Sequence, residues 1–216
     1  DTLDPAAHAK SQVSGLSAWE WQEPLPQGNA LHAVTAGKKL YIAVGDAGTV
    51  LFASSLPGEF VSSEDARSWT PIAPIIRESL FDVVFGERRA GERAGASAGE
   101  GVFVAVGASG TVIRSTDGKR WTAVDSGTDA DLRRITHGRH GFVAVGGTTL
   151  VTSPDGLAWK IIDTDIDPPG QGLFPPLFHS VRYGNGQYVA LVDLGPDLAK
   201  PGDEARVLTS TDAVQW

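Results

Sequence analysis

A seven-residue pattern, Ser-x-Asp-x-x-x-Trp, occurs four times along the chain, as SEDARSW, STDGKRW, SPDGLAW and STDAVQW. Trp121 and Trp159, in the second and third copies, are 38 residues apart. A repeat spacing of about 20–50 residues is the signature of proteins built from stacked structural units. The chain is therefore predicted to be a repeat protein. The motif residues are Ser63, Asp65, Trp69, Ser115, Asp117, Trp121, Ser153, Asp155, Trp159, Ser210, Asp212 and Trp216.

Each motif copy follows apolar, β-branched segments of strand length, such as FVAVGASGTVIRS at 103–115 and FVAVGGTTLVTS at 142–153. A further segment precedes these, as in LRRITHG at 132–138, and a short apolar tail follows the tryptophan in the first three copies. Glycine, asparagine and aspartate separate the segments, which is typical of turns between strands. Each unit therefore contains four strands, and a unit of about 40–45 residues is one blade of a β-propeller. The predicted fold is all-β, a propeller of four-stranded antiparallel blades.

The expected organisation is an N-terminal extension at 1–18 followed by a propeller at 19–216. The four repeats are expected at approximately 28–73, 78–125, 130–163 and 177–216, and WEWQEPLP at 19–26 is interpreted as a lone outer strand. Two arrangements remain open. The two ends of the chain share one blade and close a four-bladed ring, or the repeats belong to a larger ring, which we favour.

The motif is predicted to form the turn between the third and fourth strands of each blade. The aspartate can accept backbone N–H bonds, and glycine tolerates a positive φ. The tryptophan is expected to pack between blades with its indole N–H satisfied. Gly118 and Gly156 suit such a turn, whereas Ala66 and Ala213 occupy the same position in the first and last copies and predict some strain there. The four aspartates belong to different blades, so they are expected to be structural and not catalytic.

These repeats resemble the Asp-box (BNR) repeats of sialidase-like propellers, and the pattern FVAVG-x-x-G-T-x-x-x-S-x-D-G-x-x-W is also similar to photosystem II assembly-factor-like proteins. The resemblance covers roughly residues 19–216 and implies architecture far more than activity. Sialidases use an arginine triad with an Arg-Ile-Pro motif and a Tyr–Glu pair. This chain has no Arg-Ile-Pro, and its tyrosines are Tyr41, Tyr183 and Tyr188. We therefore expect a non-catalytic member.

The composition limits the kinds of partner. The chain has 26 acidic and 18 basic residues, a net charge of −8, which is a poor match to nucleic acid. No apolar run is long enough to span a bilayer. The absence of cysteine excludes disulfides and thiolate metal sites. The chain does not begin with methionine, which together with the resemblance to secreted and cell-envelope propellers predicts a secreted, periplasmic or cell-surface protein.

Alignment of the first strand of each repeat places His32, Phe81, Arg133 and His179 in one column. This column, with Asp82 and Arg134 beside it, is expected to line a central channel. Two imidazoles and a carboxylate are a possible divalent metal site. No close spacing such as His-x-His supports it, so we favour polar channel lining and expect no metal and no cofactor.

Insertions in the repeats are the expected places for binding, because loops on a repeated scaffold carry function. The segments 54–62 and 87–100 enlarge turns on one face of the propeller. The segments 164–177 and 193–205 share the other face and one blade, and we predict that they form the binding surface. An acidic cluster there is also a possible Ca²⁺ site through oxygen ligands. The candidate binding residues are Asp165, Asp167, Leu173, Phe174, Asp193, Asp197, Asp203 and Glu204.

The sequence thus predicts a non-catalytic, secreted or envelope-associated propeller that acts as a protein-binding or assembly scaffold. A glycan-binding or glycoside-hydrolase propeller of sialidase type is the first alternative. The second is a subunit of a larger complex whose ring is completed by another chain.

Overall fold

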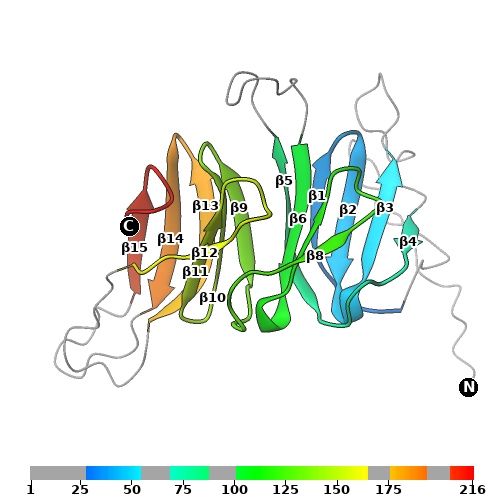
Figure 1. Ribbon diagram of the computed structural model, residues 1–216, viewed down its shortest axis with the longest axis horizontal. Helices are drawn as coiled ribbons and strands as arrows, with labels where there is room; N and C mark the ends of the chain where they lie inside the picture. Colours follow the sequence, from blue (N-terminus) through cyan, green and yellow to red (C-terminus); the bar gives the residue numbers. More distant parts are fainter. Residues whose placement is uncertain (1–27, 55–68, 88–100, 165–175, 194–204) are drawn as a thin grey trace, which may run out of the picture.

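The chain folds into four antiparallel β-sheets that lie side by side in chain order (Figure 1). The computed structural model describes residues 28–54, 69–87, 101–164, 176–193 and 205–216. Within these ranges the regular structure is β-strand with two short 3-10 turns. The predicted fold class, an all-β propeller of antiparallel blades, is confirmed.

The four sheets are called blades 1 to 4. Blades 1 to 3 each have four strands, and three strands are described in blade 4. In every blade the strands pair antiparallel with their neighbours in sequence. Blade 1 contains β1 (Leu31–Gly37), β2 (Leu40–Gly45), β3 (Val50–Ser54) and β4 (Thr70–Ile72); blade 2 contains β5 (Leu80–Glu87), β6 (Gly101–Gly107), β7 (Val112–Ser115) and β8 (Thr122–Val124); blade 3 contains β9 (Arg134–Gly138), β10 (Gly141–Gly146), β11 (Thr149–Ser153) and β12 (Lys160–Ile161); blade 4 contains β13 (Leu177–Gly184), β14 (Gln187–Asp193) and β15 (Ala205–Ser210).

The second strands show how the blades stack. Every residue of β6 and β10 is buried, because a neighbouring blade covers each face of these strands. This explains their nearly continuous apolar sequences, GVFVAVG and GFVAVG, since a strand buried on both faces does not alternate in polarity. In β14 buried and more exposed residues alternate, so only one face of blade 4 is covered.

Three apolar clusters form the core, one at each junction between successive blades. A ladder of three aromatic rings stands in each of blades 2, 3 and 4. Neighbouring ring centroids are 4.6–4.7 Å apart for the first pair and 6.3–6.4 Å for the second. Such tilted pairs stabilise the core beyond the area that they bury. The ladders are Phe85–Phe103–Trp121, His137–Phe142–Trp159 and Tyr183–Tyr188–Trp216.

The row of blades does not close into a ring. The first strands β1, β5, β9 and β13 lie next to one another in that order. Blade 1 and blade 4 stand at opposite ends of the row (Figure 1). The described residues therefore form an open arc, not the closed four-bladed ring. The extension at 1–18 and the strand expected at 19–26 lie outside the described residues.

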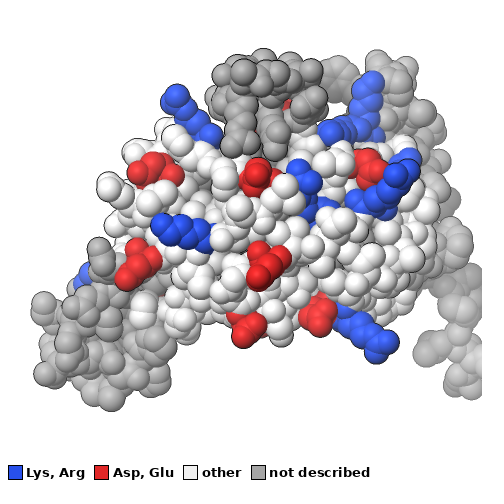
Figure 2. Space-filling view, in the orientation of Figure 1, with Lys and Arg blue, Asp and Glu red and all other residues white. Residues whose placement is uncertain are grey.

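Charges of both signs are interspersed among neutral side chains on the face displayed in Figure 2. None of the described segments forms a helix long and apolar enough to cross a membrane.

Candidate functional site

The Ser-x-Asp motif uses its side chains within its own turn. Ser115 Oγ accepts the Gly118 N–H at 2.8 Å and donates to Asp117 Oδ1 at 3.1 Å. The same carboxylate oxygen accepts the N–H groups of Lys119 at 2.9 Å and Arg120 at 2.7 Å. The turns at 153–159 and 210–216 repeat this pattern. In the first copy only Trp69 is described, and Ser63 and Asp65 lie outside the described residues.

The turn hydrogen bonds hold these aspartates in their ionised form. The amide groups of Arg120 and then Lys119 lower the pKa of Asp117. Those of Gln215 and Val214 lower the pKa of Asp212 in the same way. At Asp155 partial burial opposes the effect, but the amide bonds still bring its pKa below the ordinary value. An ionised carboxylate that is occupied by its own loop is unsuited to act as a general acid.

The motif tryptophans differ in one respect from the expectation. Trp121 Nε1 donates to Gly118 O at 3.2 Å. The indole nitrogens of Trp159 and Trp216 are buried and have no hydrogen-bond partner among the described residues. The expected hydrogen bond from the indole N–H is therefore present in one of these three tryptophans. Ala213 lies at φ 65°, the left-handed region that glycine occupies in Gly118 and Gly156. The alanine is therefore strained at this position.

A row of β-bulges shapes the inner wall of the arc. The register of β1, β5 and β13 shifts near the start of each strand, and the extra residue is His32, Phe81 or His179 respectively. In blade 3 the equivalent residue is Arg133, which donates its N–H to Val145 O although Val145 pairs with Arg134. A bulge redirects a side chain out of the ladder and often occurs beside functional sites. We call these four residues, with Asp82 and Arg134, the inner wall.

Three of the bulge residues contact one another across blades. The His32 and Phe81 ring centroids are 6.0 Å apart, and the Arg133 guanidinium lies 4.9 Å above the Phe81 ring. The three basic bulge residues also face carboxylates. His32 Nε2 lies 2.7 Å from Asp46, Arg133 lies 2.9 Å from Asp131, and His179 lies 3.8 Å from Asp193. The hydrogen bond from His32 lowers the pKa of Asp46. The inner wall thus alternates donors, acceptors and one aromatic ring.

Asp82 joins three blades at the inner wall. Its Oδ1 accepts the N–H of Val83 at 2.9 Å in its own strand, and its Oδ2 accepts the N–H of Ile135 at 3.0 Å in blade 3. Arg182 of blade 4 lies 3.9 Å from the same Oδ2. Burial raises the pKa of Asp82, although the two amide bonds act in the opposite direction. Arg134, the remaining wall residue, is exposed and donates to Arg133 O.

The described residues contain no group of His, Asp or Glu side chains that could hold a metal ion. Of the predicted binding residues only Asp193, at the end of β14, is described. The others lie outside the described ranges, so the loop surface and the Ca²⁺ site remain predictions. They are Asp165, Asp167, Leu173, Phe174, Asp197, Asp203 and Glu204.

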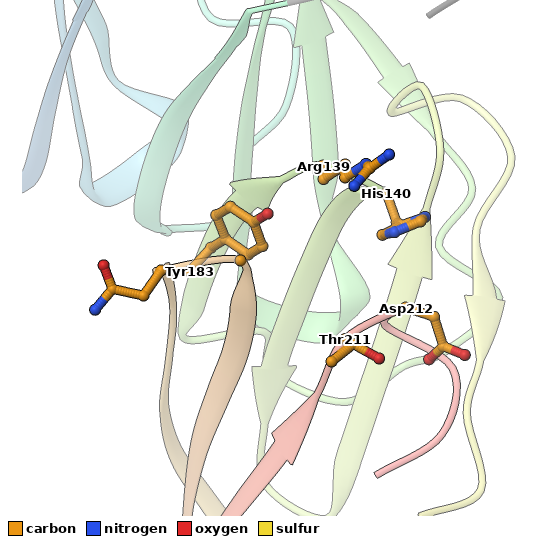
Figure 3. Close-up of a pocket in the computed structure, with 7 residues that line it drawn as sticks. Arg139, His140, Tyr183, Thr211 and Asp212 are labelled. Carbon is orange, nitrogen blue, oxygen red and sulfur yellow. The ribbon is translucent and has the colours of Figure 1, made fainter.

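A pocket of about 590 Å³ opens between blades 3 and 4. In Figure 3, Arg139 and His140 from the β9–β10 turn lie on one side, and Thr211 and Asp212 from the motif turn of blade 4 lie on the other. Tyr183 of β13 forms a further wall. The pocket therefore offers cationic and amide donors, a carboxylate and an aromatic ring. Asn185 and Gly186 complete its lining.

Contacts at the other blade junctions explain why this place is open. Between blades 1 and 2, Lys38 Nζ donates to Thr116 O at 2.8 Å. Between blades 2 and 3, Arg114 Nε donates to Asp155 O at 3.2 Å. Arg139 occupies the turn position of Lys38, but within the described structure it makes no such bond to the blade 4 turn. Sequence reasoning did not identify this pocket, because GRHG and GNG indicate only tight turns.

The fold defines the chain as part of a β-propeller, and comparisons with known structures agree. A structure of YCF48 bound to a D1 peptide matches 83% of this chain at 16% identity, with a TM-score of 0.50. YCF48 from Cyanidioschyzon merolae matches 85% at 18% identity, with a TM-score of 0.51. The match covers 53% and 57% of those chains, so this chain spans just over half their length. At these identities the likeness shows the fold alone.

A Bacillus subtilis arabinanase, Arb43A, matches 84% of the chain and 72% of its own length at 15% identity, with a TM-score of only 0.40. No protein-family model matches the sequence. A search of curated protein sequences also gives no match.

Proposed function

We propose that this propeller is a non-catalytic scaffold that holds a segment of another protein along its inner wall. The observation that carries the proposal is the row of bulges, which brings His32, Phe81, Arg133 and His179 from four blades onto one line. A polypeptide segment lying across the blades would meet a new donor, acceptor or ring at each one. The YCF48 structure with a bound peptide supports this reading by analogy of fold.

The inner wall has the chemistry that a peptide backbone needs. The basic bulge residues His32, Arg133 and His179 each lie beside a carboxylate and present hydrogen-bond donors. Phe81 offers an aromatic surface between a histidine and an arginine. The segments 164–177 and 193–205, which the sequence predicts as the binding surface, lead into β13 and follow β14 in the chain. We also propose a secreted or envelope location, as in the Asp-box propellers that the sequence resembles, which cell fractionation tests.

Several features support a non-catalytic role. The described motif carboxylates are engaged by their own turns. Asp82 has a raised pKa, which is common at active sites, but both of its oxygens accept backbone N–H groups. Its position suits the joining of blades better than proton transfer.

The test is selection of peptides from a random display library, followed by fluorescence anisotropy with the selected peptide. Arg133→Ala and His179→Ala should each raise the Kd of the selected peptide about tenfold or more. A tenfold change corresponds to a loss of about 1.4 kcal/mol of binding free energy. Arg120→Ala is the control, since its side chain is 93% exposed in a motif turn. Equal Kd values for all four proteins would contradict binding at the inner wall.

Glycan binding is a second candidate, because the pocket between blades 3 and 4 combines hydroxyl, amide and charged groups with the Tyr183 ring. Sugar hydroxyls both donate and accept hydrogen bonds and suit such a mixture. A glycan array with the wild-type protein tests it, followed by titration of any sugar that binds. Arg139→Ala should remove the binding, whereas Lys39→Ala, at the position of His140 in the exposed turn of blade 1, should not. Failure of the array to show any bound sugar would remove this candidate.

A further inference from the structure

Each junction between blades is built by the same three aliphatic positions. Two lie on the second strand and one on the third strand of the earlier blade, and they pack against the next blade. In blades 1, 2 and 3 the exposed fraction of all these side chains is 4% or less. The three sets are Ile42, Val44 and Val50; Val104, Val106 and Val112; and Val143, Val145 and Leu150.

Blade 4 has the same three positions, but in the described part of the chain two of them are exposed. The pair Tyr188–Ser210 corresponds to Phe142–Ser153 in blade 3, which places Val189, Leu191 and Val207 in the equivalent set. Leu191 is 48% exposed and Val207 is 62% exposed. These three residues are called the open face of blade 4. An exposed apolar surface of this kind is characteristic of an interface.

A glycine beside each junction shows what the missing neighbour contributes. Gly37, Gly86 and Gly138 are each the last or the last but one residue of the first strands of blades 1 to 3, and an aromatic ring of the next blade occupies the space of the absent side chain. The rings are Phe85 on Gly37, His137 and Phe142 on Gly86, and Tyr183 on Gly138. At Gly184, the corresponding glycine of blade 4, no atom of the described residues lies within 4 Å of the position that a Cβ would occupy. Blade 4 therefore has space beside Gly184 for an aromatic ring of a neighbouring blade.

Blade 1 of a second copy lacks the first ring of the aromatic ladder. It does expose Leu31 and Val34, by 47% and 63%, at the positions of the buried Leu80 and Val83. However, Ala36 stands where blade 2 has Phe85, although Tyr41 stands at the position of Phe103. A head-to-tail pair of copies would therefore place an alanine, not a ring, at the position from which Phe85 and Tyr183 fill the spaces at Gly37 and Gly138.

We propose that the open face of blade 4 docks a further blade of the same repeat type, supplied from outside these 216 residues. The docking blade carries the aromatic ladder, with an aromatic residue directly before the glycine that ends its first strand. Its aliphatic side chains cover Leu191 and Val207, and its ring rests on Gly184. This interface is independent of peptide binding at the inner wall.

The test is to extend the full chain with a second copy of residues 160–216, which carries its own Tyr183–Tyr188–Trp216 ladder. Leu191→Asp should change the Tm of the 216-residue chain little, because the side chain is exposed. In the extended chain the same substitution in the original blade 4 should lower the Tm by about 5–10 °C, since it would bury a charge. Tyr183→Ala in the appended copy should also lower the Tm of the extended chain.

Two outcomes would overturn the proposal. The first is that Leu191→Asp is equally harmless in both chains, which would mean that the open face accepts no blade of this type. The second is that the 216-residue chain dimerises and that Val207→Asp and Val34→Asp each abolish the dimer. That result would assign the open face to a second copy.

Discussion

Replacement of Asp82 by alanine should destabilise the protein by about 3 kcal/mol, because this side chain links blades 2 and 3. Its side chain is 14% exposed, and its two oxygens accept the N–H groups of Val83 and Ile135. Both of those residues are buried, so water does not readily replace the lost acceptor.

The magnitude follows from the two amide groups. A buried donor left without an acceptor costs about 1–3 kcal/mol, so two such groups cost about 2–6 kcal/mol. Part of this loss is offset, because the ionised carboxylate is itself unfavourably buried, as its raised pKa indicates. The contact with Arg182 at 3.9 Å adds little, since that side chain is 66% exposed. Asp82→Asn keeps one acceptor oxygen and should cost about 1–2 kcal/mol.

Urea unfolding at pH 7 measures the free energies, and hydrogen exchange by NMR measures the protection of the Ile135 amide. Ser180→Ala is the matched control, because Ser180 holds the position of Asp82 in blade 4 and should change stability by less than about 0.5 kcal/mol. An Asp82→Ala protein as stable as the wild type, or one that keeps full protection of Ile135, would refute the reasoning.

Two other predictions concern Tyr188 and acid stability. Tyr188→Phe should lower the free energy of urea unfolding by about 1–3 kcal/mol, because the buried Tyr188 hydroxyl accepts the His140 N–H and donates to Gly141 O, both at 3.0 Å. Tyr183→Phe should be nearly neutral, since the Tyr183 hydroxyl has no hydrogen-bond partner among the described residues. Equal losses in the two variants would count against this assignment. Asp117, Asp155 and Asp212 have lowered pKa values, so the stability that they contribute is present above the unfolded value near 3.8 and is lost as the pH falls further. Asp82, with its raised pKa, acts in the opposite sense: its protonation favours the folded state as the pH falls through its folded-state pKa, and thermal unfolding from pH 6 to pH 2.5 should therefore show a steeper acid loss in Asp82→Asn. An unchanged acid profile in an Asp117→Asn, Asp155→Asn and Asp212→Asn protein would contradict the turn assignment.

The blade architecture could be predicted from the sequence because the signals that specify it are local. The Ser-x-Asp turn closes its hydrogen bonds within six residues, so the motif itself indicates the turn. The strands β6 and β10 are nearly continuous apolar runs, which directly reflects burial on both faces. The column of His32, Phe81, Arg133 and His179 also follows from alignment of the first strands. The structure adds that these residues are bulges.

Features that depend on packing between blades could not be predicted. Lys38 and Arg139 occupy the same turn position, yet only Lys38 bonds the next blade, and the pocket results from that difference. Tyr188 stands where blades 2 and 3 have phenylalanine, and its hydroxyl acquires partners only once blade 3 lies beside it. The exposure of the open face of blade 4 could not be predicted either, because the sequence YVALV differs little in composition from the covered FVAVG.

The central claim is that the repeated motif builds the scaffold and that the inner wall binds. Its most direct test measures Tm and peptide Kd together for Asp117→Ala and Arg133→Ala, with the peptide selected on the wild-type protein. Asp117→Ala should lose about 1–2 kcal/mol of stability, since it removes an acceptor shared by two backbone amides, and should keep its Kd within about twofold. Arg133→Ala should keep its Tm and bind at least about tenfold more weakly. Loss of binding in a folded Asp117→Ala protein, with unchanged binding in Arg133→Ala, would contradict the account.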